Sequence, residues 1–227
     1  MTSPRRQGRI YDGLRADGHT QMALDCHLLD TVRDGPAVRF YRWDGPWLSL
    51  GRHQRNIPQH WQALADAGEL SMVRRPSGGD AVLHDGGLTY ALIWPDAPRQ
   101  RHQAYQQACQ WLIDGFASLG CRLDFGQQPA VVGADNCFAR STAADLVDDR
   151  EEKRIGSAQR WIQGRLLQHG EILLDPPAAL WTAVFGSDAP APADPRIPRD
   201  SLGDHLIAAL QRQWDQTDWR HERLPTP

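Results

Sequence analysis

The sequence predicts an α+β fold in which helices pack on one mixed β-sheet. Short apolar or alternating segments of strand length recur along the chain, bounded by turn residues such as Asp44-Gly45-Pro46. Longer segments carry apolar residues on one helical face, as do Tyr105, Ala108, Leu112 and Phe116. A chain of 227 residues also fits one large domain, which can bury a core without disulfides or metals.

Helices are expected where apolar spacing is helical and a boundary residue stands at an end. Pro58 and Gly68 bound the helix expected at 58–67, and Gly120 ends the one expected at 101–119. Ser201 can cap a last, C-terminal helix. That last helix contains Leu202 and Leu206. The other four are expected at residues 21–32, 58–67, 101–119 and 178–185.

Strands are expected where short apolar segments lie between turns. Their ranges are 37–43, 47–50, 70–73, 81–83, 88–94, 121–125, 130–132, 154–155, 161–167 and 171–174. Residues 74–80 and 186–198 are rich in Gly, Pro or Asp and are expected to be loops. Residues 1–19 are expected to be a polar N-terminal lead-in. Residues 20–227 are then one domain that ends in a helical tail.

Composition and charge give no indication of a nucleic-acid-binding, membrane-spanning or metal-binding protein. The net charge is −3 and the pI about 6.3, which give no general case for nucleic-acid binding. No run of about 18 apolar residues predicts a membrane span, and no signal-like segment is seen. None of the four cysteines forms a C-x-x-C pair, so no metal site is expected. We therefore expect a cytoplasmic protein with reduced thiols. An acidic partner would need a local basic patch, to which Arg74 and Arg75 could contribute.

A glycine-rich stretch follows the strand that ends near Val73. Gly78 and Gly79 let the backbone approach a ligand closely, and free backbone N–H groups there can hold an anion or an acyl carbonyl oxygen. Arg74 and Arg75 add positive charge. A tight hairpin with exposed arginines explains the same residues equally well.

A second stretch carries small residues. Gly156, Ser157 and Ala158 leave space for a substrate chain, and Lys153 just before them could be an ammonium in a partly dry pocket. Taken alone, Lys153 is more often a solvated surface lysine. His84 and His169 are each either an acid/base group or an ordinary structural histidine.

Cysteine supplies the third candidate. A cysteine is a nucleophile as the thiolate, which a nearby cation stabilises, and Lys153 is close enough to Cys137 in sequence to be that cation. Cys109 and Cys121 are better interpreted as small buried hydrophobes.

These stretches resemble a known family. Arg74-Arg75-Pro76-Ser77-Gly78-Gly79 with His84-Asp85 is similar to the R-R-x-[ST]-G-G-x-x-x-x-H-D signature of lipoate-protein ligases and octanoyltransferases. Lys153 to Gln159 resembles the family's K-[IV]-x-G-S-A-Q, and Gln168-His169-Gly170 its L-Q-H-G. The resemblance runs from about residue 21 to about residue 174. Three ordered motifs are far more specific than one.

The resemblance implies a catalytic domain with a central mixed sheet, related to biotin protein ligase, in which the glycine-rich loop and the motif lysine surround an acyl-binding tunnel. Two activities share this fold. Ligases use ATP and Mg²⁺ to form an acyl-adenylate. Octanoyltransferases take octanoate from acyl carrier protein without ATP. We expect the residues around Leu83, Leu88 and Tyr90 to line the tunnel.

Cys137 favours the transferase, because it resembles the cysteine of the cysteine-dependent octanoyltransferases that modify the glycine cleavage H protein. The expected catalytic residues are Cys137 and Lys153. The expected substrate-binding residues are Arg74, Ser77, Gly78, Gly79, His84, Gly156, Ser157, Ala158 and His169. Acyl carrier protein is the expected donor, a lipoyl-domain protein the acceptor, and a monomer the expected state.

Three residues depart from the family pattern. Asp80 stands where ligases usually have Gly, Glu171 where Ser usually follows His-Gly, and Cys26 where Glu is common. The first adds negative charge beside the glycine-rich loop, which disfavours a nucleotide phosphate. Two alternatives stay open: an ATP-dependent lipoate-protein ligase, and a non-catalytic protein that binds acyl carriers.

Overall fold

The computed structural model describes residues 6–126 and 145–225. Its centre is a mixed eight-stranded sheet with the order β11-β1-β2-β6-β10-β9-β8-β7. β1 pairs in parallel with both β2 and β11, and the other neighbours are antiparallel. The strands are β1 (Arg6–Ala16), β2 (Ala37–Trp43), β6 (Leu88–Trp94), β7 (Asp124–Phe125), β8 (Asp145–Val147), β9 (Lys153–Ile162), β10 (Arg165–Ile172) and β11 (Thr217–Glu222).

A second, three-stranded sheet lies beside the first. Its order is β4-β3-β5, from β3 (Trp47–Leu50), β4 (Ser71–Arg74) and β5 (Val82–His84). β3 runs parallel to β4 and antiparallel to β5. The glycine-rich loop therefore connects the two outer strands of this small sheet.

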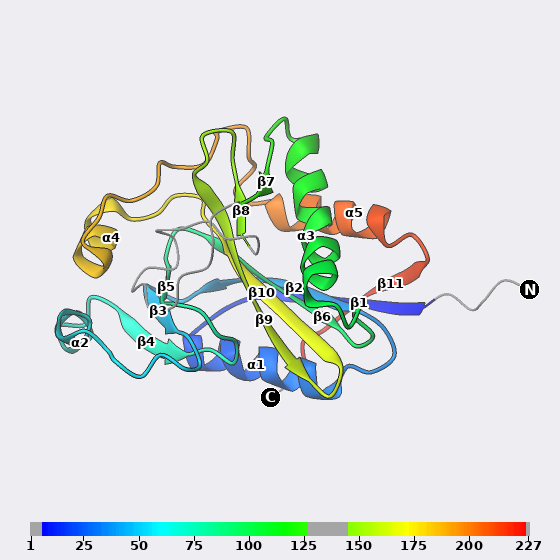
Figure 1. Ribbon diagram of the computed structural model, residues 1–227, viewed down its shortest axis with the longest axis horizontal. Helices are drawn as coiled ribbons and strands as arrows, with labels where there is room; N and C mark the ends of the chain where they lie inside the picture. The colour runs from blue at the N-terminus through cyan, green and yellow to red at the C-terminus, as the bar shows by residue number, and fades with distance from the viewer. Residues whose placement is uncertain (1–5, 127–144, 226–227) are drawn as a thin grey trace, which may run out of the picture.

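Helices cover both faces of the large sheet, as Figure 1 shows. α1 (Gly18–Thr31) lies on one face, while α3 (Arg101–Ser118) and α5 (Leu202–Gln213) lie on the other. α2 (Gln59–Asp66) and α4 (Ala178–Phe185) pack beside the small sheet. No helix in the described part of the chain is long and apolar enough to cross a membrane.

Strand alternation divides the core into separate clusters. Leu88, Tyr90 and Leu92 of β6 face α3 and α5. Ala91 and Ile93 of the same strand face α1. Both faces of β6 are buried, which explains why this segment is apolar at almost every position.

Helix ends follow the expected local chemistry in two places. The Asp17 carboxylate accepts a hydrogen bond from the Thr20 N–H at 3.0 Å and so caps α1. Gly186 adopts a φ of 67° immediately after α4, a conformation that glycine reaches without strain.

The fold class is confirmed, and the ranges expected for 37–43, 47–50, 88–94 and 178–185 match β2, β3, β6 and α4. Residues 6–16 are different: they form β1 inside the large sheet, although they were expected in a polar lead-in. β11 was also not expected, since residues 217–222 are mostly polar. The two strands pair with each other at the sheet's edge, where water can solvate polar side chains.

The segment 153–172 also differs from expectation. β9 runs unbroken through Gly156-Ser157-Ala158, and the chain then turns at Gln163 and Gly164, both with positive φ. A strand over 161–167 is therefore wrong, because it would cross that turn. Of the strand expected at 121–125, only 124–125 pairs. The strand expected at 130–132 lies outside the described residues.

Candidate active site

A pocket lies between the α1-side face of the large sheet and the small sheet. Six residues singled out from the sequence line it: Gly79, His84, Gly156, Ser157, Ala158 and His169. Met22 of α1 and Tyr41 and Trp43 of β2 supply apolar and aromatic walls. The sequence motifs, which lie far apart along the chain, thus meet at one cavity.

Strand register explains how the floor of this pocket forms. His169 and Glu171 are two residues apart on β10, so both side chains project from the same face. Opposite them on β9 stand Ala158 and Gly156, respectively. The small residues leave the space above β9 open, and the larger side chains of β10 border it. Gly-Ser-Ala therefore shapes the pocket as part of a strand.

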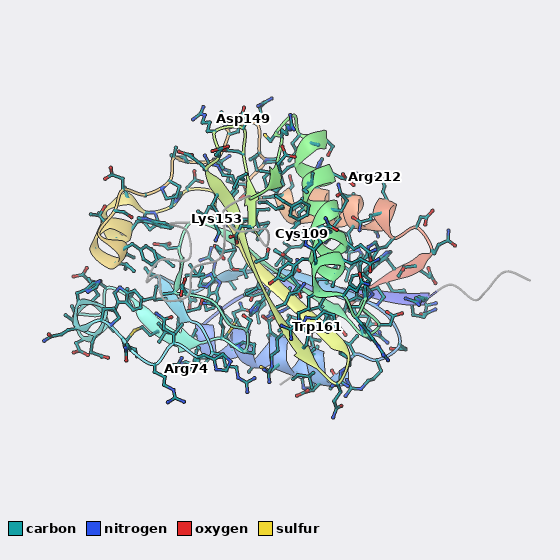
Figure 2. The ribbon with its side chains drawn as sticks, viewed as in Figure 1. Arg74, Cys109, Asp149, Lys153, Trp161 and Arg212 are labelled. Atoms are coloured by element: carbon teal, nitrogen blue, oxygen red, sulfur yellow. The ribbon has the colours of Figure 1, made fainter. Side chains whose placement is uncertain are left out.

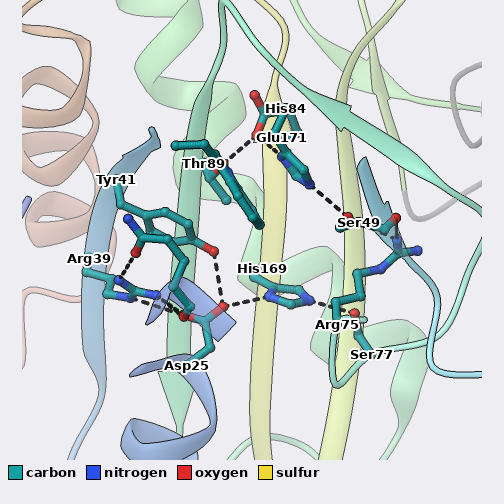
Figure 3. Close-up of polar contacts among 12 residues, drawn as sticks. Asp25, Arg39, Tyr41, Ser49, Arg75, Ser77, His84, Thr89, His169 and Glu171 are labelled. Atoms are coloured by element: carbon teal, nitrogen blue, oxygen red, sulfur yellow. Dashed lines mark hydrogen bonds and ion pairs between the residues drawn. The ribbon is translucent and has the colours of Figure 1, made fainter. Parts of the chain in front are cut away.

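One histidine cluster ties α1 to the sheet. His169 Nδ1 lies 2.7 Å from Asp25 Oδ2, and His169 Nε2 lies 2.6 Å from Ser77 Oγ. Asp25 Oδ1 accepts hydrogen bonds from Arg39 Nε at 3.0 Å and Nη2 at 2.6 Å. Tyr41 donates to Asp25 Oδ2 at 3.1 Å. Figure 3 shows this chain of contacts running from Arg39 through Asp25 to His169 and Ser77. It joins α1, β2, β10 and the glycine-rich loop.

Charge is balanced within this cluster. Asp25 and Arg39 are both fully buried. Burial raises the pKa of the Asp25 carboxyl, but Arg39 and His169 outweigh it and hold that pKa below its usual value. The pKa of Tyr41 is raised well above its usual value, by burial first and by Asp25 second. Asp25 is therefore an ionised partner of a buried guanidinium.

A second histidine cluster faces the same pocket. His84 Nδ1 lies 2.8 Å from Glu171 Oε2, and His84 Nε2 lies 2.8 Å from Ser49 Oγ. The Trp43 ring stacks on the imidazole at 4.1 Å between centroids. Thr89 donates a hydrogen bond to Glu171. Burial lowers the pKa of His84, and Glu171 offsets part of that effect. The imidazole is therefore neutral near pH 7.

The glycine-rich loop is shaped by Arg75. Its guanidinium donates to the Ser49 carbonyl at 2.9 Å, to the Gly78 carbonyl at 2.8 Å and to Asp80 O at 2.6 Å. These bonds turn two loop carbonyls toward Arg75, and Gly79 between them has a φ of 92°. Arg75 is thus the arginine of the pair that lines the pocket.

Several predicted residues lie around the pocket and do not line it. Arg74 is exposed and donates at 2.7 Å to the carbonyls of Gly51 and Gln54. Ser77 and Gly78 form the loop behind Gly79. Ser157, in contrast, lines the pocket, and its Oγ lies 2.8 Å from the Tyr90 hydroxyl. Leu83, Leu88 and Tyr90 pack into hydrophobic clusters instead of this pocket, whose apolar walls are Met22, Trp43 and Val82.

Lys153 is buried at the start of β9. Its Nζ lies 2.9 Å from Asp145 Oδ1 of β8, and both side chains are at most 5% exposed. This ion pair fixes the position of the ammonium and rules out a solvated surface lysine. Figure 2 labels Lys153, which is the first residue of β9. Cys137 lies outside the described residues.

The three described cysteines lack the surroundings of a nucleophile. Burial raises the pKa of the Cys109 thiol to about 12, and burial is also the largest cause of the raised pKa of Cys26 and of Cys121. Cys109 is buried, as expected, whereas Cys121 was expected to be buried and is only partly so.

Sequence reasoning missed part of the site. Asp25, Arg39 and Ser49 were not singled out as site residues, yet they hold the two histidines in place directly or through one contact. Glu171 was noted only as a departure from the family pattern. Charged residues inside otherwise apolar segments, as Arg39 is within Ala37–Trp43, were the available signal.

The fold and site define an α+β domain in which a glycine-rich loop and two buried histidines meet at a pocket. Residues 17–201 match the family described as the lipoyl protein ligase A/B catalytic domain. The chain belongs to that family. The match includes both histidines, the glycine-rich loop and Lys153.

Curated relatives give a finer comparison. The chain is 35% identical to octanoyltransferase LipM of Halalkalibacterium halodurans, over 74% of this chain and 66% of that protein. It is 37% identical to octanoyltransferase LipM of Lysinibacillus sphaericus, over 68% of this chain and 61% of that protein. The chain therefore spans slightly less than two thirds of the length of these relatives.

Solved structures share the fold. The structure of protein Ta0514 from T. acidophilum with bound lipoic acid superposes with a TM-score of 0.82 at 20% identity, covering 96% of this chain and 90% of that one. Lipoate-protein ligase A bound with ATP gives a TM-score of 0.76 at 21% identity, with the same coverage.

Proposed function

We propose that this protein is an octanoyltransferase of lipoate biosynthesis. It moves an octanoyl group from acyl carrier protein to a lysine of a lipoyl domain, such as that of the glycine cleavage H protein. The observation that carries the proposal is its 35–37% identity to proteins named octanoyltransferase LipM. The pocket at the family motifs supports it, because its apolar and aromatic walls can contact an acyl chain.

The proposed reaction has two steps, and Cys137 is the nucleophile. Its thiolate attacks the octanoyl carbonyl carbon, the new S–C bond replaces the bond to the phosphopantetheine sulfur, and that thiolate leaves. The acceptor lysine's neutral amine then attacks the acyl-enzyme. A C–N bond forms, the bond to Cys137 breaks, and the amine loses a proton. The reaction consumes neither ATP nor Mg²⁺.

Lys153 and the glycine-rich loop have distinct proposed roles. The Lys153 ammonium, held by Asp145, stabilises the thiolate. Backbone N–H groups near Gly79 or Gly156 stabilise the oxyanion. His84 and Lys153 are the candidates for the amine's proton. Because both ring nitrogens of His84 are already hydrogen-bonded, a proton reaches it through Ser49, whose side chain lines the pocket.

Glu171 supports a thioester donor over a free acid or an adenylate. Its side chain is buried, faces the pocket and, within the described part of the chain, pairs with no lysine or arginine. A carboxylate there repels a phosphate or a second carboxylate through a medium of low dielectric, whereas a thioester carries no charge. The relatives' usual serine would not do so.

The test supplies two sets of substrates to the purified protein with a lipoyl domain. One set is octanoyl-acyl carrier protein without nucleotide, and the other is free octanoate or lipoate with ATP and Mg²⁺. We expect the lipoyl domain to gain one octanoyl mass in the first set only. Modification in the second set alone would establish a ligase. Carrier binding without modification in either would establish a non-catalytic binding protein.

A further inference from the structure

The loop between β3 and α2 carries a concentration of positive charge. Residues 51–57 read Gly-Arg-His-Gln-Arg-Asn-Ile, and Arg52, His53 and Arg55 are exposed. Arg74 of the neighbouring strand β4 is exposed as well and is hydrogen-bonded across this loop. No carboxylate of the described residues forms an ion pair with these three arginines.

This loop lies directly against the pocket's glycine-rich loop. The Arg52 N–H donates to the Ser77 carbonyl at 2.9 Å. Gly51 approaches Gly79 so closely that a Cβ on Gly51 would lie 1.7 Å from the Gly79 carbonyl oxygen. Gly79 lines the pocket. The exposed arginines are therefore separated from the acyl site by a single layer of backbone.

We call Arg52, Arg55 and Arg74 the basic rim. An acidic residue, Asp80, lies at the end of the adjoining glycine-rich loop, where its backbone carbonyl accepts a hydrogen bond from Arg75.

An apolar side chain accompanies the basic rim. Ile57, at the end of the loop, is 38% exposed, and among the described residues only Leu14 is another large hydrophobic side chain with such exposure. A single exposed apolar side chain is ordinary at a protein surface, and here it adds apolar area beside the arginines. The loop thus combines positive charge, which attracts an acidic partner, with an apolar side chain that a partner can cover.

We propose that the basic rim, with Ile57, is the docking surface for the acyl-donor protein, an acidic carrier whose phosphopantetheine arm bears a phosphodiester. This inference rests on the proposed function. The chain's net charge of −3 opposes association with an acidic protein, so a local basic surface has to supply the attraction. The phosphodiester of the donor's arm is an anion of the kind that guanidinium groups bind well.

The test compares binding with catalysis in the whole chain. The variant Arg52→Glu/Arg55→Glu reverses two charges, and the loop keeps the hydrogen bond that the Arg52 backbone N–H donates to the Ser77 carbonyl. Arg74 stays unchanged because its guanidinium holds the loop. Arg212→Glu is the matched control: it is exposed on α5, and Figure 2 shows it on the other side of the molecule from Arg74.

Two measurements follow for each protein. The first is the Kd for fluorescently labelled holo-acyl carrier protein at low and high salt. The second is the rate of enzyme acylation by octanoyl-acyl carrier protein and by the small neutral thioester octanoyl-N-acetylcysteamine. We expect the double variant to weaken carrier binding at low salt by about tenfold or more and to lose most of the salt dependence. Its rate with the small thioester stays at the wild-type level.

Three results would overturn the inference. They are carrier binding by the double variant as tight as wild type, an equal loss in Arg212→Glu, and a loss confined to binding of a lipoyl domain. Binding is measured without turnover, so failure of the proposed transfer reaction in the wild type would not be mistaken for failure of docking. Folding of each variant is checked by its melting temperature.

Discussion

The two histidines at the pocket have the same kind of neighbours but a different charge balance. His169 lies between the Asp25 carboxylate and the Ser77 hydroxyl, and His84 between the Glu171 carboxylate and the Ser49 hydroxyl. Asp25 is also bonded to the guanidinium of Arg39. Glu171 receives hydrogen bonds from an imidazole and the Thr89 hydroxyl, and it forms no ion pair with a described lysine or arginine.

Because of that difference, we expect one cluster to act mainly on the stability of the fold and the other mainly on the choice of ligand. The Asp25 carboxylate is paired with a buried guanidinium and its cluster joins four parts of the chain, so its main effect is on stability. The Glu171 cluster places a carboxylate on the wall of the pocket, so its main effect is on which ligands enter. The comparison predicts that equivalent changes in the two clusters will have different consequences.

The largest effect is expected from Arg39→Met, which leaves Asp25 buried without its cation. Breaking one partner of a buried ion pair costs about 3–5 kcal/mol. Urea unfolding, followed by tryptophan fluorescence, should show a free energy of unfolding lower by that amount. A loss below about 1 kcal/mol would mean that Asp25 is not stabilised by Arg39, and the comparison would fail.

A smaller effect is expected from Glu171→Gln, which keeps the shape and removes the charge. Octanoate should bind this variant about tenfold more tightly than wild type, because a repulsion of about 1.4 kcal/mol is lost. Octanamide, which is uncharged, should bind both proteins equally and serves as the control in calorimetry. Unchanged octanoate affinity would show that Glu171 does not select against anions.

A third comparison removes one hydroxyl from each cluster. Ser77→Ala leaves His169 Nε2 without its hydroxyl partner behind the glycine-rich loop, a loss of about 1–2 kcal/mol. Ser49→Ala should cost less, since Ser49 lines the pocket, where water can replace the hydroxyl. Chemical denaturation of both variants measures the difference. Equal costs would argue that the two clusters are equally shut off from solvent.

The smallest effect concerns pH. The folded-state pKa of His84 is lowered by burial, and only part of the effect is offset by Glu171. Below its unfolded pKa of about 6.5, the unfolded chain takes up a proton that the folded chain does not. The free energy of unfolding should therefore fall as the pH drops below about 6.5, and His84→Gln should remove part of this fall. Denaturation of both proteins at several pH values tests the sign; parallel curves would contradict it.

The sequence predicted elements best where both faces of a segment are buried. β2, β3 and β6 are buried at almost every position and are mostly apolar, and short apolar runs locate such strands well. β1 and β11 were missed because edge pairing allows polar side chains. The motif histidines were found, but their partners Asp25 and Glu171 lie 144 and 87 residues away, and the pairing of distant polar residues follows from the fold alone.

The most direct test of the account is the covalent acyl-enzyme. The protein is incubated with octanoyl-acyl carrier protein in the absence of ATP, and its intact mass is measured before and after hydroxylamine. The account predicts a mass increase of one octanoyl group that hydroxylamine removes, that Cys137→Ala abolishes and that Cys109→Ala leaves unchanged. Normal transfer to a lipoyl domain by Cys137→Ala, or an adduct that persists in that variant, would contradict it.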